Sequence, residues 1–164
     1  MGDETIVLHA FLPAFFILLV VSPGLAAWKG GEPERLGGLV ILAMWGLQSF
    51  GEYFLPSRFS TVDPVAFCSD LVGTLGFGFI ALHARRVWPL WAASLQLLSL
   101  SAHFARWADI GIPKIVYALM RGGPTFVVML VLLAGTLAHW RRMRRVAVDH
   151  PWQSWRTGSG KSGC

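Results

Sequence analysis

Residues 65–83 read VAFCSDLVGTLGFGFIALH, a run in which Asp70 is the only residue charged at neutral pH. A bilayer core about 30 Å thick is crossed by roughly 20 apolar residues in an α-helix, so this run predicts a transmembrane helix. Its apolar residues are too continuous for a half-buried strand or for a membrane β-barrel strand, in which apolar and polar residues alternate.

Four more apolar stretches, at 6–27, 36–55, 88–105 and 115–138, fill most of the chain. Hydrophobic residues make up 54% of the 164 residues and charged residues 14%, against about a quarter charged in a soluble domain. The sequence therefore predicts an all-α, polytopic transmembrane helical bundle of about five spans over residues 1–140. The Arg-Gly-Gly-Pro string at 121–124 interrupts the last span, so four spans with a re-entrant piece are the alternative.

The basic residues predict the orientation, because cytoplasmic loops carry an excess of Lys and Arg. With the N-terminus outside, the cytoplasmic side holds ten of the fourteen basic residues and the outer side three, while Arg121 lies within a span. The ten are Lys29, Arg35, Arg85, Arg86, Arg141, Arg142, Arg144, Arg145, Arg156 and Lys161, and the three are Arg58, Arg106 and Lys114. We therefore expect an N-out, C-in membrane protein, with residues 141–164 as a basic, disordered cytoplasmic tail.

The net charge of +5 is explained by that tail, which would meet anionic lipid. No nucleic-acid-binding module is visible, so we expect the lipid bilayer as a partner and no nucleic acid. The first span lacks the positively charged segment of a cleaved signal peptide, and we expect it to be retained. Six tryptophans near predicted helix ends or in the tail are typical of an interfacial aromatic belt: Trp88, Trp91, Trp107, Trp140, Trp152 and Trp155.

Six polar residues on four helices share the outer half of the bilayer in this topology: Glu52, Asp70, His103, Arg106, Asp109 and Arg121. Charges at such depth usually face the bundle interior and pair with one another. The natural pairs join Glu52 or Asp70 to Arg121 or Arg106. One interpretation is structural, with buried ion pairs that hold the helices in register. The other is a proton or ligand pathway open to the periplasmic side.

Small residues four apart predict close approach of helices. The pattern occurs at Ser69 and Gly73, at Thr74 and Gly78, and at Ala134 and Ala138. The two cysteines, Cys68 and Cys164, fall near opposite membrane faces, so they are not expected to pair, and we expect Cys68 to be a small packing residue.

In this topology two histidines lie on each side of the membrane, and each pair could hold haem b as a cofactor. His9 and His103 lie on the outer side, and His83 and His139 on the inner side. Terminal histidines are also ordinary interfacial residues, and no zinc or di-iron motif is present. We predict neither a cofactor nor a metal site.

Several short strings, in this order, resemble a family of small uncharacterised multi-span inner-membrane proteins of alphaproteobacterial type. The resemblance covers roughly residues 31–142, and its most specific part is the Trp-Pro-Leu-Trp string at 88–91. It implies an inner-membrane location and supplies no activity, cofactor or catalytic residue. The strings are EPERL at 32–36, STVD at 60–63, DL at 70–71, RVWPLWAA at 86–93, QL at 96–97, His103, YA at 117–118 and LLAGT at 132–136.

The sequence contains no catalytic constellation and no soluble domain, which favours a non-enzymatic integral membrane protein. We expect an accessory or scaffold subunit of a membrane assembly, bound to other membrane subunits or to itself. A small transporter or channel that uses the outer-half residues is the first alternative, although no internal repeat is visible. A haem- or quinone-binding electron-transfer subunit is the second.

Overall fold

A computed structural model describes residues 2–54, 63–108, 114–145 and 152, with side chains omitted for residues 2–11, 106 and 114–121. Its helices match the five predicted spans closely and confirm the all-α bundle. They are α1 (Gly2–Lys29), α2 (Glu32–Phe54), α3 (Pro64–His83), α4 (Trp88–Trp107) and α5 (Lys114–Met143).

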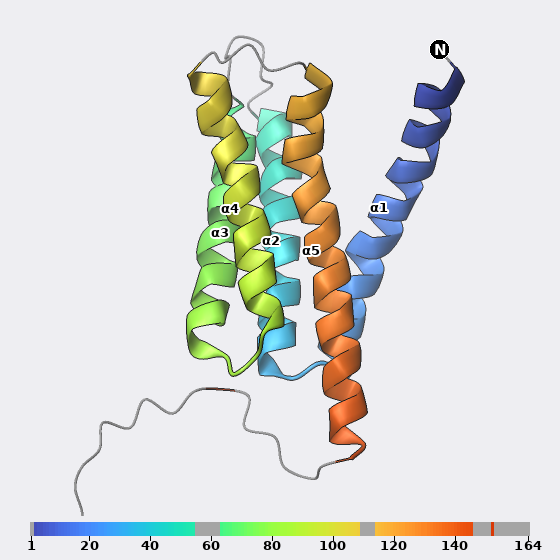
Figure 1. Cartoon of the computed structure of the whole chain (residues 1–164), viewed down its shortest axis with the longest axis vertical. Coiled ribbons are helices and arrows are strands. Elements are labelled where there is room, and N and C mark those ends of the chain that lie inside the picture. The colour runs from blue at the N-terminus through green and yellow to red at the C-terminus, as the bar shows by residue number, and fades with distance from the viewer. Residues whose placement is uncertain (1, 55–62, 109–113, 146–151, 153–164) are drawn as a thin grey trace, which may run out of the picture.

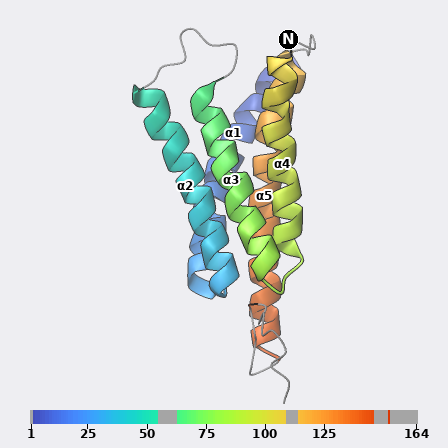
Figure 2. The same ribbon diagram turned by 90° about the vertical axis from the view of Figure 1, so that its left-hand side faces the viewer.

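The helices run alternately up and down, and each packs against its neighbour in the sequence (Figure 1). Because α1 also packs against α5, and α2 touches α5, the five helices close on themselves. Figure 2 shows α2 and α3 side by side, with α1 behind them. The N-terminal half of α1 leans away from α5 (Figure 1). We call the end of the bundle that holds Lys29, Arg85 and the end of α5 the basic end, and the opposite one the Asp63 end.

The start of α5 does not break at residues 121–124. The helix continues through Pro124, which is buried, so the structure has one long helix where the re-entrant alternative expected an interruption. Neighbouring helices can support such a proline by packing, although its missing N–H removes one helical hydrogen bond. The helix also extends to Met143, three residues into the segment predicted as a tail. Residues 146–151 and 153–164 of that segment lie outside the described part of the chain.

Three of the described helices are long and apolar enough to cross a membrane. The three stretches are Leu12–Lys29, Pro64–His83 and Gly122–Met143, and they are compatible with an integral membrane protein. Among the described residues, α2 carries Glu32, Glu34 and Arg35 in its first turn, and α4 carries buried Gln96, Ser99 and His103.

Trp88 forms the centre of the core near the basic end. Its side chain is buried, and Phe77 meets it edge-on with ring centroids 6.3 Å apart. Trp88 therefore points into the bundle, whereas Trp91 and Trp107 are exposed, and the interfacial depth expected of all three stays a prediction. A helix end close to the interface does not fix the direction in which its side chain points, and Trp88 points inward.

Two glycines leave the space that the Trp88 indole fills. A Cβ atom added at Gly135 of α5 would lie 2.7 Å from Trp88 Cδ1, and one at Gly37 of α2 would lie 2.7 Å from Trp88 Cη2. Close packing of α2, α4 and α5 thus depends on the absence of side chains at these two positions.

Gly135→Ala is expected to destabilise the protein by about 1–3 kcal/mol, because the added methyl group overpacks the indole. Gly78→Ala is the matched control, since nothing lies within 4 Å of a Cβ at that helical position. That change should be neutral or should stabilise α3 by up to about 1 kcal/mol. Thermal unfolding of both variants in detergent checks the prediction, and equal unfolding temperatures would contradict it.

Candidate functional site

Asp70 lies at the centre of a buried polar cluster in the Asp63 half of the bundle. Its Oδ2 atom accepts a hydrogen bond from Ser99 Oγ at 2.9 Å and lies 2.9 Å from His103 Nε2, the natural donor to a carboxylate. The side chains of His103 and Asp70 are 1% and 8% exposed. Together these contacts join α3 to α4 away from water.

The inward face of α4 carries polar residues one helical turn apart. Gln96, Ser99 and His103 are all buried and follow the spacing i, i+3, i+7, which places them on one helix face. In the described part of the chain, neither the amide nitrogen nor the amide oxygen of Gln96 has a hydrogen-bond partner. A buried amide without partners is costly, since buried polar groups are nearly always hydrogen-bonded.

A cavity of about 200 Å³ adjoins Asp70. Its walls come from α1, α2, α3 and α5, and they are mostly apolar, with Ser69 and Gln48 among the few polar residues. Ser69 itself donates a hydrogen bond to the Met44 carbonyl oxygen at 3.0 Å, which joins α3 to α2. Because the bonds from Ser99 and His103 both end on Oδ2, the Oδ1 atom of Asp70 takes no part in them.

A second buried cluster lies at the basic end around Glu34. This side chain is fully buried, and its Oε1 atom accepts a hydrogen bond from Trp88 Nε1 at 3.0 Å. Its Oε2 atom accepts one from the Gly31 backbone N–H at 3.1 Å. Arg86 Nε lies 3.8 Å from Oε1, so a buried cation balances the carboxylate. Glu34 thus ties the start of α2 to the turn before it and to the start of α4.

Arg86 extends this cluster to α5. Its Nη2 atom lies 3.2 Å from His139 Nδ1. Because a guanidinium only donates hydrogen bonds, Nδ1 of His139 is the acceptor in this contact. Four side chains from α2, the α3–α4 turn, α4 and α5 therefore meet here.

An apolar layer separates the two clusters. On α3 the buried Phe77 lies between Asp70 and the turn that holds Arg86, and on α4 the buried Ala92 lies between Trp88 and Ser99. Ile41 of α2 and Leu132 of α5 are fully buried apolar residues as well. The arrangement fits two separate sets of polar contacts between helices better than one continuous path for protons or ions.

The structure places the other predicted outer-half residues as follows. Glu52 is exposed and accepts a hydrogen bond from Gln48 of its own helix, away from the buried cluster. Asp109 and the side chains of Arg106 and Arg121 lie outside the described residues. The proposed pairing of Asp70 with Arg121 or Arg106 therefore stays a prediction, while Asp70 and His103 are brought together.

The small-residue pairs behave differently from one another. Gly73 packs against α2 and α4, since an added Cβ would lie 2.5 Å from Met44 Sδ and 3.1 Å from Gln96 Cδ. Thr74 donates to the Asp70 carbonyl of its own helix, and Gly78 faces open space. Ala134 and Ala138 are exposed on the outside of the bundle. Cys68 is exposed as well, which corrects the expectation that it is a small packing residue.

The histidines considered as haem ligands have other neighbours. His103 is bonded to Asp70, and His139 accepts from Arg86. His83 lies 2.9 Å from the Phe79 carbonyl oxygen of its own helix and stacks on the Phe79 ring. The side chain of His9 is outside the described part. Within that part, no three potential metal-ligating side chains come together.

The sequence analysis missed the Glu34 cluster because it predicts that the second span begins at Leu36, which leaves Glu34 outside the helix. The helix begins at Glu32, so Glu34 falls in its first turn and faces inward. A carboxylate in the first turn of a helix is a known favourable pattern and was the available signal. The strings EPERL and RVWPLWAA, which carry the family resemblance, contain Glu34, Arg86 and Trp88. Gln96 and Ser99 were visible as a helical series ending at His103.

No protein-family model, no curated protein and no solved structure matches the chain. The family resemblance therefore stays a prediction. In both clusters, most of the polar atoms are directed at one another.

Proposed function

We propose that the protein is a non-enzymatic subunit of a bacterial inner-membrane assembly, with an accessory or scaffold role. The observation that supports this role is that the buried charges are used to hold helices together. The carboxylate of Glu34 is occupied by Trp88, Gly31 and Arg86, and Oδ2 of Asp70 by Ser99 and His103. Such groups fix the register of a bundle without requiring a substrate.

The outer surface is consistent with contact to lipid and to other helices. Large apolar side chains such as Phe16, Ile17 and Val20 on α1 and Leu75 and Leu82 on α3 are exposed. On α1 these exposed side chains lie on a different face from the buried Leu19 and Ser22, so they point away from the bundle. The N-terminal half of α1 also leans away from α5 (Figure 1). We propose the exposed face of α1 as the contact for a partner helix.

Purification tests the proposal. The tagged chain, expressed at native level and extracted in mild detergent, should elute with a stoichiometric membrane partner. Replacing Phe16, Ile17 and Val20 together by alanine should release that partner, whereas the matched triple change of Leu75, Phe79 and Leu82 on α3 should not. Recovery of the chain alone, or equal loss of the partner in both variants, would contradict the scaffold role.

A small transporter or channel is the second candidate, and the cavity beside Asp70 together with the unpartnered Gln96 amide favours it. The apolar layer between the clusters argues against it. A folded Asp70→Asn variant that lost ion or solute flux in proteoliposomes would favour the transporter or channel.

A further inference from the structure

A groove of about 610 Å³ runs along the outside of the bundle between α5 and the start of α4. At the basic end its walls include Arg85 and Arg142, and further along α5 they include Val131, Ala134 and Ala138. Trp91 of α4 forms part of the opposite wall. The groove is thus cationic at one end and apolar along its length.

The two arginines at the mouth of the groove carry positive charge that the described residues do not balance. Arg85 and Arg142 are exposed, and neither is paired with a carboxylate in the part of the chain that the structure describes. Arg86, the third arginine of the groove, is buried and lies beside Glu34 and His139. The charge available to a ligand therefore comes from Arg85 and Arg142.

The apolar part has the shape of a trough along one face of α5. Arg142, Ala138, Ala134 and Val131 are spaced four, four and three residues apart, so they form one stripe on the helix. With a rise of 1.5 Å per residue, this stripe is about 16 Å long. The alanines are exposed and short, which leaves room beside the helix where larger side chains would fill it.

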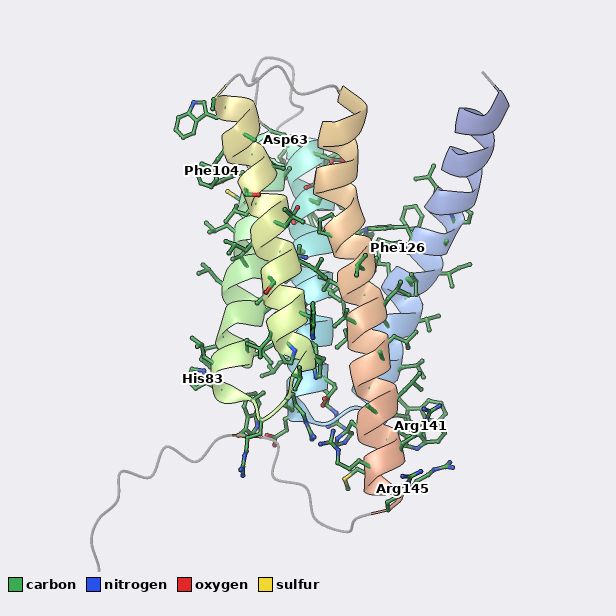
Figure 3. All side chains as sticks on the ribbon, viewed as in Figure 1. Asp63, His83, Phe104, Phe126, Arg141 and Arg145 are labelled. Carbon is green, nitrogen blue, oxygen red and sulfur yellow. The ribbon has the colours of Figure 1, made fainter. Side chains whose placement is uncertain are left out.

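Aromatic and basic side chains surround this end of α5 on its other side too. Lys29 Nζ lies 4.3 Å from the Trp28 ring centroid, and the Arg144 guanidinium lies 4.1 Å from the Trp140 ring centroid. Tryptophan beside lysine and arginine is typical of the headgroup level of a membrane. Figure 3 shows Arg141 and Arg145 at the same end of α5.

We infer that this groove binds one anionic phospholipid. The lipid phosphate lies between the guanidinium groups of Arg85 and Arg142, which suit phosphate oxygens as paired donors. One acyl chain lies over Ala138 and Ala134 toward Val131. A charged head joined to an apolar chain matches both ends of the groove, and basic pockets between membrane helices bind anionic lipid headgroups.

The binding experiment uses the full-length chain in detergent after lipid removal. Added phosphatidylglycerol should raise the unfolding temperature and should appear as a single bound lipid in native mass spectrometry. Phosphatidylcholine and inorganic phosphate at the same concentration should do neither. An equal shift with inorganic phosphate would show that the arginines bind an anion without a lipid, and an equal shift with phosphatidylcholine would show that headgroup charge is irrelevant; either result overturns the inference.

Matched variants separate the groove from general surface charge. The double change Arg85→Gln and Arg142→Gln should weaken phosphatidylglycerol binding about 25-fold, since each arginine near an anionic lipid contributes roughly five-fold. Arg141→Gln with Arg145→Gln removes the same charge outside the groove and should have little effect. Ala134→Leu with Ala138→Leu keeps the charge, fills the trough and should also reduce binding. Equal losses in the first two variants, or full binding in the third, would overturn the inference.

Discussion

Glu34→Gln is expected to lower the stability of the bundle by about 3–5 kcal/mol, the cost of breaking a buried ion pair on one side. The side chain is fully buried, and the change removes the charge that balances Arg86. The new amide also places a donor where the Trp88 indole N–H or the Gly31 N–H needs an acceptor. A loss of this size is a large fraction of the stability of a small protein.

The experiment is thermal or denaturant unfolding in detergent, with Glu52→Gln as the matched control. Glu52 is exposed and bonds only within its own helix among the described contacts, so its change should stay within about 0.5 kcal/mol of the parent. The double variant Glu34→Leu with Arg86→Met should be less destabilised than Glu34→Leu alone, because it removes both buried charges. If Glu34→Gln were as stable as the control, the contacts of Glu34 with Arg86, Trp88 and Gly31 would not stabilise the bundle.

The spans could be predicted from the sequence because membrane insertion depends on the length and apolarity of a run of residues. The partners of the buried polar residues could not be predicted from the sequence, because hydropathy gives no information about the direction in which each helix face points. Asp70 was correctly singled out as a buried charge, yet its described partners are Ser99 and His103. His103 had been placed near a helix end, where a histidine is ordinarily interfacial.

Glu34 shows the second limit. An error of four residues in the start of a helix, from Glu32 to Leu36, moved this residue from a buried face into a solvent-exposed turn. Such boundary errors are common in sequence interpretation. Such errors matter most in a membrane protein. A polar residue that is wrongly assigned to a loop is expected in water, so no buried partner is sought for it.

The Asp70–His103 contact is expected to be energetically coupled. Asp70→Leu should destabilise the bundle by about 2–4 kcal/mol, because the buried Ser99 hydroxyl and His103 ring lose a carboxylate acceptor. Adding His103→Leu should recover part of that loss, with a coupling energy of about 0.5–3 kcal/mol. Ser101→Ala is the control on the same helix, since this exposed hydroxyl bonds only to the Leu98 carbonyl among the described contacts.

The same double-variant cycle with Arg121→Gln tests the predicted Asp70–Arg121 pair. If Asp70 is coupled to both His103 and Arg121, its carboxylate links α3 to α4 and α5. If the losses of stability are strictly additive in both cycles, Asp70 interacts with neither residue. Parental stability in Asp70→Asn with loss of flux would instead assign the carboxylate to a pathway. Because Oδ2 already accepts two hydrogen bonds and an apolar layer lies below it, we expect coupling and no flux.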